Sequence, residues 1–232
     1  MRKIKLIFNP MSDRGRSGQK ASDLRAIVEE HGGADWVGTE YPTHAADLAA
    51  KAGLEGYDTV VALGGDGTVH EVVNGLMRVA LPHRPKLSVV PIGSGNDFAY
   101  GAGVPMDPAE SMKRVFTGTA RPIDIGVAHD NNHRTEYWDN SVGIGFDGKI
   151  NIMSRKIEGL YGFPLYLTAV LRTIATDYES AQMKLTFDDG PTIERTVLML
   201  TLGNGLREGG GFLTTPAAKV DDGQFDYVAV SH

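Results

Sequence analysis

The sequence predicts an α/β fold, in which an N-terminal doubly wound parallel-sheet domain precedes a second, mainly antiparallel β-sandwich domain. Strand-like and helix-like segments alternate over residues 3–92, as in a parallel sheet with helices on both faces. After residue 120, strand-like segments follow one another with few helices between them. Glycine-rich joints also follow the predicted strands, at the sheet edge where such folds bind ligands.

The first domain can be divided into elements by hydrophobic periodicity. Residues 59–63 are an unbroken apolar run, which suits a central strand buried on both faces. Apolar residues after Gly67 recur at the spacing of one helix face, so a helix begins near Gly67 and Thr68. Thr43 is predicted to cap the preceding helix. The predicted order is strand 3–9, helix 18–31, strand 34–40, a helix from residue 43, strand 59–63, a helix from residue 67, strand 87–92 and a short helix within 105–118.

The second half of the sequence consists mainly of strand-like segments, so we place the domains at residues 1–120 and 121–232. Because the last predicted strand would leave an unpaired sheet edge, we expect this domain to be incomplete at its C-terminus. Its one predicted helix, residues 160–176, carries an apolar stripe that we expect to lie mostly in the core, with contact to a lipid tail as the alternative. The predicted strands lie within residues 121–145, 181–189, 192–202 and 225–230.

The composition narrows the class of protein. With 41% hydrophobic and 22% charged residues, the 232-residue chain is an ordinary globular protein. No apolar stretch is long enough to span a bilayer, and the absence of cysteine fits a reducing compartment, so we expect a cytoplasmic protein. The net charge of -6 argues against general nucleic-acid binding. Residues 1–25 carry a local positive excess, including Arg14 and Arg16, which is either a solvated face or lies near phosphates or anionic headgroups.

The turn GGDGT after the predicted central strand is the strongest candidate site. Gly64, Gly65 and Gly67 leave no side chain between the backbone N–H groups and an anion. Thr68 adds a hydroxyl group. Asp66 would repel a phosphate unless a divalent cation lies between them or the carboxylate accepts a substrate proton. Both roles indicate phosphoryl chemistry.

The joint after the fourth strand has similar chemistry. Ser94 offers a hydroxyl group, and Asn96 and Asp97 either cap the next helix or organise metal-bound water. Asp124 alternates with two isoleucines, so it could join Asp66 and Asp97 in one acidic network.

Two further positions carry polar groups near the predicted phosphate site. The first joint, NPMSDRGRSG, is neither a Walker A sequence nor a dinucleotide fingerprint, but Asn9, Ser12, Arg14 and Gly15 could face a phosphate. Glu71 lies one turn along the helix from Gly67, where it either orients a ligand or bonds to a neighbouring loop.

Several linked motifs together resemble the bacterial diacylglycerol kinase family, which also includes sphingosine and related lipid kinases. They run through the chain in the family's order: NP-x(4)-G, GGDGTVHEVVNG, PIGSGNDFA, WDNSVGIGFDG and GGG-x(4)-P-A-x(3)-DDG-x-FD. The GGDGT motif alone is shared with NAD kinases and phosphofructokinases.

The resemblance implies an NAD kinase/diacylglycerol kinase-like fold and ATP-dependent transfer of the γ-phosphoryl group to a lipid hydroxyl at the membrane surface. It implies ATP contacts at Asn9, Thr39, residues 65–68 and Ser94, with Asp66 at the catalytic Mg²⁺ and phosphates. It also implies a structural Mg²⁺ at Asp222, with the main chain of Lys219 and Gln224.

The expected protein is thus an ATP- and Mg²⁺-dependent lipid kinase with diacylglycerol as the favoured acceptor. We expect transient peripheral contact with the membrane, and a homodimer is compatible with the sequence. Ser94 and Tyr100 replace the threonine and arginine common in the family. The resemblance also implies a later Asp-Gly-Glu segment with the general base, which we expect this chain to lack. The alternatives are an NAD-kinase-like enzyme with a soluble substrate and a truncated nucleotide-binding module without turnover.

Overall fold

The chain forms two compact units, Met1–Asp139 and Asn140–His232, in a computed structural model that describes residues 2–12 and 21–231. Our sequence division near residue 120 differs from this one by about 20 residues. The boundary between the units is therefore later in the chain than the point at which strand-like segments begin to follow one another.

The hairpin of β5 (Gly126–His129) and β6 (Thr135–Trp138) accounts for the difference, because it belongs to the first unit. Asn74 of the first unit fixes this hairpin through two hydrogen bonds to the backbone of Tyr137. The Asn74 Nδ2 donates to the Tyr137 carbonyl at 2.8 Å, and the Asn74 Oδ1 accepts the Tyr137 N–H at 3.0 Å. The strand-rich part of the sequence thus begins with a hairpin that still belongs to the first unit.

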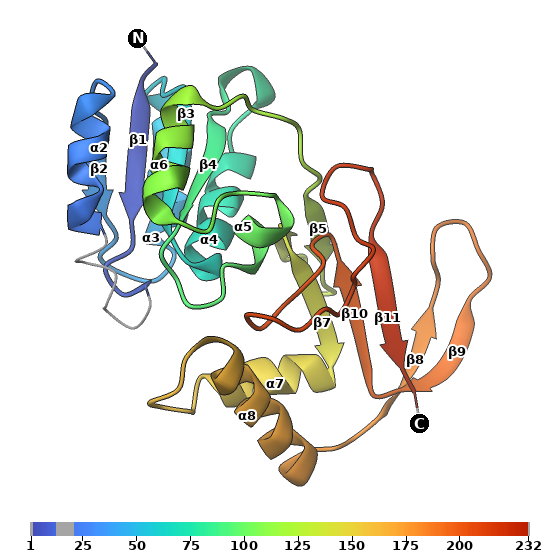
Figure 1. The fold of residues 1–232 in the computed structure, drawn as a ribbon. Coiled ribbons are helices and arrows are strands. Elements are labelled where there is room, and N and C mark those ends of the chain that lie inside the picture. Colours follow the sequence, from blue (N-terminus) through green and yellow to red (C-terminus); the bar gives the residue numbers. More distant parts are fainter. Residues whose placement is uncertain (1, 13–20, 232) are drawn as a thin grey trace. The chain divides into compact units, whose positions relative to one another are not determined.

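The first unit contains the predicted parallel sheet (Figure 1). Its strands are β1 (Ile4–Phe8), β2 (Asp35–Gly38), β3 (Thr59–Gly64) and β4 (Lys86–Pro91), all parallel and in the order β2-β1-β3-β4. Every residue of β3 is buried, as expected for a central strand with helices on both faces. The parallel α/β architecture is confirmed.

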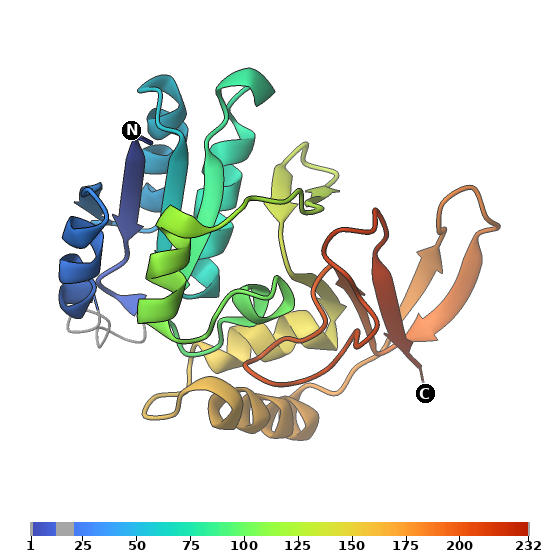
Figure 2. The same cartoon turned by 45° about the horizontal axis from the view of Figure 1, so that its top comes forward.

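Helices cover both faces of this sheet, and the alternation of β3 separates the two cores. Val60 and Ala62 pack with α3 (His44–Leu54) and α4 (Asp66–Met77), whereas the intervening Val61 and Leu63 face the opposite side. There they pack with α2 (Arg25–Glu30) and α6 (Pro108–Thr117). In Figures 1 and 2, α6 lies in front of the sheet and α4 behind it. The 3-10 helix η2 (Leu81–His83) precedes β4, and α5 (Asp97–Gly101) follows it.

The N-terminus of α3 is capped by a residue other than the one we predicted. Thr43 has a left-handed backbone (φ 72°), and its side chain makes no capping hydrogen bond. Instead, the carboxylate of Glu71 accepts the N–H of Thr43 at 3.0 Å and that of Ala45 at 3.1 Å. A carboxylate at a helix N-terminus satisfies free N–H groups and complements the helix dipole, so Glu71 joins α4 to α3.

Gly75 allows α3 and α4 to approach closely. A Cβ atom at this position would lie 2.1 Å from the carbonyl oxygen of Ala46 and 2.8 Å from the Ala49 Cβ. Only a residue without a side chain fits this contact without a shift of the helix backbone.

The second unit contains a three-stranded antiparallel sheet of β7 (Ser141–Gly145), β10 (Met199–Gly203) and β11 (Asp226–Val230), in the order β11-β10-β7. A separate hairpin pairs β8 (Ala181–Leu185) with β9 (Ile193–Val197). The predicted antiparallel character of this region is confirmed.

Two helices follow β7, where we predicted only one. The unpredicted helix, α7 (Phe146–Ser154), begins where Gly145 takes a left-handed φ of 80° and ends the strand, a change that apolar periodicity does not reveal. The predicted helix is α8 (Gly162–Thr176), but its orientation is the reverse of our expectation. Ala169 and Thr173 are its buried residues, whereas much of the apolar stripe is exposed. None of the helices in the described residues is long and apolar enough to cross a membrane.

We predict that Gly75→Ala lowers the free energy of unfolding by about 1–3 kcal/mol, because the added methyl group would overlap the Ala46 carbonyl and force α3 and α4 apart. Urea denaturation measures this change. Gly67→Ala is the matched control, since Gly67 lies in the same helix and a Cβ there would meet no atom within 4 Å. The control should be neutral or stabilising by up to about 1 kcal/mol. Equal stability of the two variants would contradict the close contact.

Candidate active site

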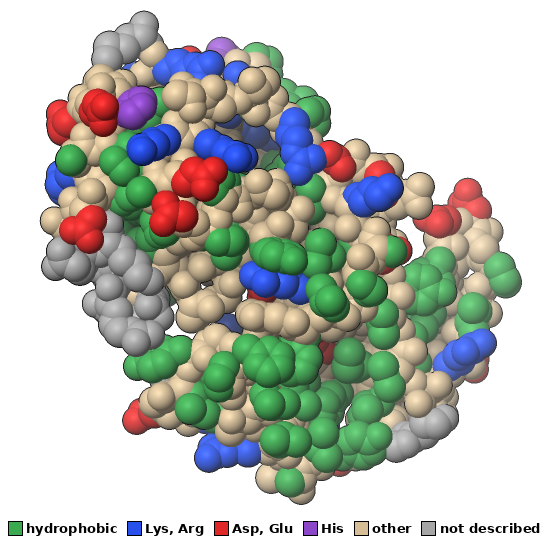
Figure 3. Space-filling view, viewed as in Figure 1, with side chains coloured by type: hydrophobic (Ala, Val, Ile, Leu, Met, Phe, Trp, Pro, Cys, Tyr) green, Lys and Arg blue, Asp and Glu red, His purple; other side chains and the backbone are tan. Residues whose placement is uncertain are grey.

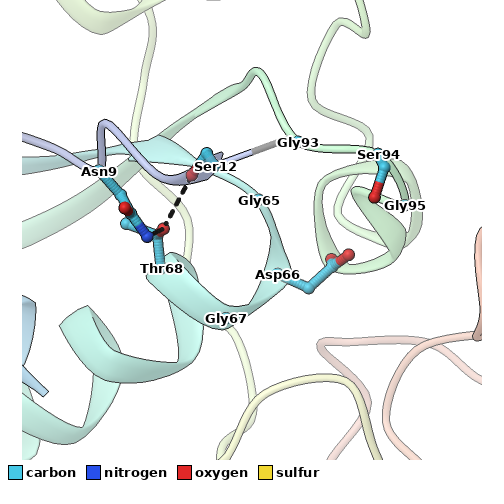
Figure 4. A pocket seen from close by; sticks show the side chains of 9 residues that line it. All are labelled: Asn9, Ser12, Gly65, Asp66, Gly67, Thr68, Gly93, Ser94 and Gly95. Atoms are coloured by element: carbon cyan, nitrogen blue, oxygen red, sulfur yellow. Dashed lines mark hydrogen bonds between the residues drawn. The ribbon is translucent and has the colours of Figure 1, made fainter. Parts of the chain in front are cut away.

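Three turns at the carboxyl ends of β1, β3 and β4 line a cavity of about 270 Å³ within the first unit (Figure 4). This is the edge at which parallel α/β sheets bind their ligands. All three predicted joints contribute to the cavity. The lining residues are Asn9, Ser12, Gly65, Asp66, Gly67, Thr68, Gly93, Ser94 and Gly95.

One side of the cavity carries three linked polar side chains. The Asn9 Nδ2 donates to the Thr68 Oγ1 at 3.1 Å, and the Ser12 Oγ lies 3.4 Å from the same oxygen. Thr68 is 2% exposed, and a Cβ at Gly64 would lie 2.3 Å from its hydroxyl oxygen. Gly64 is not among the residues that line the cavity, but its lack of a side chain makes room for Thr68.

The second and third turns touch each other through two glycines. A Cβ at Gly93 would lie 2.3 Å from the Gly65 Cα, so a side chain at this position would push the turns apart. Asn96 closes the third turn, because its Oδ1 accepts the Gly93 N–H at 3.0 Å and its Nδ2 donates to the Gly93 carbonyl at 2.9 Å. Asn96 has a left-handed φ of 56°, and its side chain does not cap α5. Its capping alternative is therefore wrong, and its side chain braces the turn.

Asp66 is the first residue of α4 and lies on the opposite side of the cavity from Asn9 and Thr68, together with Ser94 (Figure 4). Its Oδ1 accepts the backbone N–H of Phe98 at 3.2 Å. Burial, followed by the negative charges of Asp97 and Asp139, raises the pKa of Asp66 to about 6, against the effect of the Phe98 hydrogen bond. A cation beside this carboxylate would relieve both the burial cost and the repulsion.

Asp139 is the residue of this acidic group that sequence reasoning missed. It is 5% exposed, and its Oδ1 lies 3.8 Å from the Nδ1 of His70, whose Nε2 lies 2.7 Å from the Glu136 Oε1. The carboxylates of Asp139 and Glu136 raise the pKa of His70 above its usual value, against the effect of burial. The charge of Asp139 thus acts on Asp66 beside that of Asp97, and the place of Asp124 in this acidic network stays a prediction. No periodic pattern in the sequence marks Asp139, because β6 and α4 are distant in sequence and come together only in the folded chain.

The other predicted site residues that the structure describes in the first unit are not among the residues that line the cavity. Asp97 is a buried residue at the start of α5, and Asp124 lies in the irregular segment before β5. Thr39 follows β2 and donates its backbone N–H to the Phe8 carbonyl at 2.8 Å. The Glu71 carboxylate is occupied by the α3 N-terminus, which favours the neighbouring-loop alternative. Arg14 and Gly15 lie outside the described residues.

The predicted structural metal site in the second unit is an exposed turn. The Asp222 Oδ1 accepts the N–H of Gln224 at 3.1 Å, and Gly223 between them has a left-handed φ of 75°. An Asp-Gly turn forms such a bond without a metal. Lys219 is also exposed, and the described residues contain no group of three or more acidic or histidine side chains arranged to hold a metal ion. A metal at Asp222 remains a prediction.

Comparison with known proteins identifies the two parts of the chain. Residues 3–128 match the diacylglycerol kinase catalytic domain, and residues 140–232 match the YegS C-terminal NAD kinase beta sandwich-like domain. The first match covers the parallel sheet and all residues that line the cavity. The second begins at the first residue of the second unit.

Similar proteins carry the same family names. A "probable lipid kinase YegS-like" protein of Chromohalobacter salexigens is 39% identical over 80% of this chain and 58% of its own length. The diacylglycerol kinase of Bacillus subtilis is 31% identical over 97% of this chain and 73% of its own length. A crystal structure of a putative diacylglycerol kinase from Bacillus anthracis superimposes with a TM-score of 0.78, at 28% identity, and covers 99% of this chain and 73% of that one.

The chain thus spans between about half and three quarters of the length of these relatives. The family model covers more than half of its residues, and its fold is that of a solved putative diacylglycerol kinase. The chain belongs to the diacylglycerol kinase catalytic-domain family.

Proposed function

We propose that this protein transfers the γ-phosphoryl group of ATP to a lipid hydroxyl in a Mg²⁺-dependent reaction, with diacylglycerol as the favoured acceptor. The observation that carries the proposal is the glycine-lined cavity in which Asp66 stands with a raised pKa beside backbone and hydroxyl donors. The names of the similar proteins, lipid kinase and diacylglycerol kinase, support a lipid acceptor over NAD.

The triphosphate of ATP would lie over the N-terminus of α4. This 12-residue helix begins at Asp66, so its positive dipole end opens onto the cavity. Gly65, Gly67 and Gly93 let the phosphates approach the backbone, and the hydroxyl groups of Thr68 and Ser94 donate hydrogen bonds. Positioning and charge stabilisation of this kind supply most of the catalysis in phosphoryl transfer.

The side chains of the cavity fit a magnesium ion. Its lining supplies carboxylate, amide and hydroxyl oxygens, the ligand type that Mg²⁺ prefers. Asp66 would bind the ion, which would neutralise charge on the phosphates and on the transferred group. Because the described residues hold no preformed acidic metal cluster, phosphate oxygens and water would complete the ion's ligands. Asp97 and Asp139 would act by keeping the surroundings of Asp66 negative.

Asp66→Asn should abolish transfer of labelled phosphate from ATP to diacylglycerol, with a loss of at least about 100-fold, because the variant retains shape but lacks the charge that binds Mg²⁺. Thin-layer chromatography with diacylglycerol, sphingosine and NAD as acceptors measures this loss and identifies the acceptor. Asp47→Asn is the control, since Asp47 forms an exposed ion pair with Arg78 outside the cavity. Full activity of Asp66→Asn would refute the role of Asp66. Calorimetric heat with ATP but no turnover on any acceptor would indicate a binding module instead.

The same Asp66→Asn variant should be more stable than the wild-type protein in the absence of nucleotide and metal. The pKa of Asp66 is about 6 in the folded protein, against an ordinary value of 3.8 for an aspartate in the unfolded chain. Ionised Asp66 therefore opposes folding. This penalty is absent below about pH 4, grows between about pH 4 and 6 and is complete above about pH 6. We expect a gain of about 1–3 kcal/mol at pH 7.5 that disappears near pH 4, measured by urea denaturation. A less stable variant at pH 7.5 would contradict the electrostatic account.

Thr68→Val should raise KM for ATP and lower kcat/KM by about 10–100-fold, because it removes the hydroxyl group that contacts Asn9, Ser12 and the proposed phosphate. Thr68→Ser keeps the hydroxyl group and should remain within a few-fold of the wild-type protein. Steady-state kinetics at varied ATP measure both. If both variants lost activity equally, the hydroxyl group would not be the relevant feature.

A further inference from the structure

The most apolar stripe of α8 faces outward. Its members, Phe163, Leu167, Leu171 and Ile174, are 43%, 38%, 59% and 47% exposed. Their spacing of four, four and three residues places them on one side of the helix. We call these four residues the α8 apolar face. Large exposed apolar patches on a soluble protein mark sites that bind a protein or a membrane.

Contacts on the other side of the helix, and one at its N-terminal end, fix this orientation. Ala169 and Thr173 are 0% and 1% exposed, and Ala169 belongs to the core that includes Phe146 and Ile150 of α7. At the N-terminal end of α8, the ring of Phe212 stacks on that of Phe163, with 4.7 Å between centroids. The helix is therefore held from within its own unit, and the α8 apolar face does not result from a loose helix.

The charges on α8 and in the segment between α7 and α8 are mainly positive, although the whole chain has a net charge of -6. Arg172 is the only charged residue of α8, and Arg155 and Lys156 follow directly after α7, all three exposed. Glu158 is the one acidic residue between positions 150 and 176. Beyond the end of the helix, the carboxylates of Asp177 and Glu179 lie 2.6 and 3.3 Å from the Lys149 ammonium. The local excess of cations favours an anionic partner.

The surface view shows this arrangement. Hydrophobic side chains gather over the part of the second unit where Figure 1 places α7 and α8, with a basic cluster at the lower left margin of this patch and an acidic side chain at its left edge (Figure 3). An apolar surface with cations beside it matches one leaflet of an anionic membrane, in which acyl chains lie beneath negatively charged headgroups.

We propose that the α8 apolar face docks on the surface of a bilayer that contains anionic lipid. The helix lies in the plane of the interface, with Leu167, Leu171 and Ile174 among the acyl chains and Arg155, Lys156 and Arg172 at the headgroups. The choice of a lipid partner rests on the proposed function, since a kinase for lipids must reach an acceptor within a membrane. A second copy of the chain fits less well, because two such faces would bring like charges together.

The direct test is cosedimentation with vesicles of phosphatidylcholine and phosphatidylglycerol, without nucleotide, so that the result does not depend on turnover. The double variant Leu167→Gln/Leu171→Gln should partition at least about 10-fold more weakly than the wild-type protein. Arg172→Gln should weaken partition about 5-fold, and only on vesicles with phosphatidylglycerol. Leu54→Gln makes the same exchange at a residue that is 89% exposed in the first unit, and should change nothing.

Activity measurements separate this proposal from the proposed function. The double variant should phosphorylate a short-chain diacylglycerol dispersed below its micelle concentration as fast as the wild-type protein, but lose activity on vesicles. If neither protein phosphorylates any lipid while the sedimentation difference persists, the docking face stands and the kinase assignment fails. Equal vesicle partition of the wild-type and double-variant proteins would overturn the docking face. A wild-type dimer in sedimentation velocity that the double variant lacks, without vesicle binding, would assign the face to a second copy.

Discussion

The contact between Gly65 and Gly93 is the constraint on which the candidate site depends. It brings the turn after β3 against the turn after β4, and a Cβ at Gly93 would lie 2.3 Å from the Gly65 Cα. Because the turns touch, Asp66 reaches the N–H of Phe98 at the start of α5 and comes under the influence of Asp97. Two glycines thus place a carboxylate and a helix N-terminus at one cavity.

In the protein without ligand, the negative charge of Asp66 is unfavourable where it lies. Burial raises the pKa of Asp66 most, and Asp97 and Asp139 are close enough for their charges to raise it further. Folding would be easier with a neutral residue at this position, as expected when a site is built for a ligand rather than for stability. A divalent cation with a polyphosphate would supply the missing positive charge and fill the cavity with groups that the glycines leave room for.

The sequence allowed much of the architecture and part of the site to be predicted, because these features are local. The apolar run of β3, the helix stripe after Gly67 and the glycine joints all lie within short segments, and the structure brings the joints together. Asp139 could not be found in this way, since its proximity to Asp66 depends on the β5–β6 hairpin packing against α4. The α3 cap was missed because Glu71 comes from another helix. Our prediction placed the apolar stripe of α8 in the core, whereas much of it is exposed. Periodicity identifies such a stripe but not what lies opposite it.

The most direct test of the central claim is a crystal structure of the protein with a non-hydrolysable ATP analogue and Mn²⁺ in place of Mg²⁺. The account predicts an anomalous peak about 2 Å from the Asp66 carboxylate, with phosphate oxygens over the N-terminus of α4. An unoccupied cavity with Asp66 still bound to the Phe98 N–H would contradict it, as would nucleotide bound elsewhere in the chain.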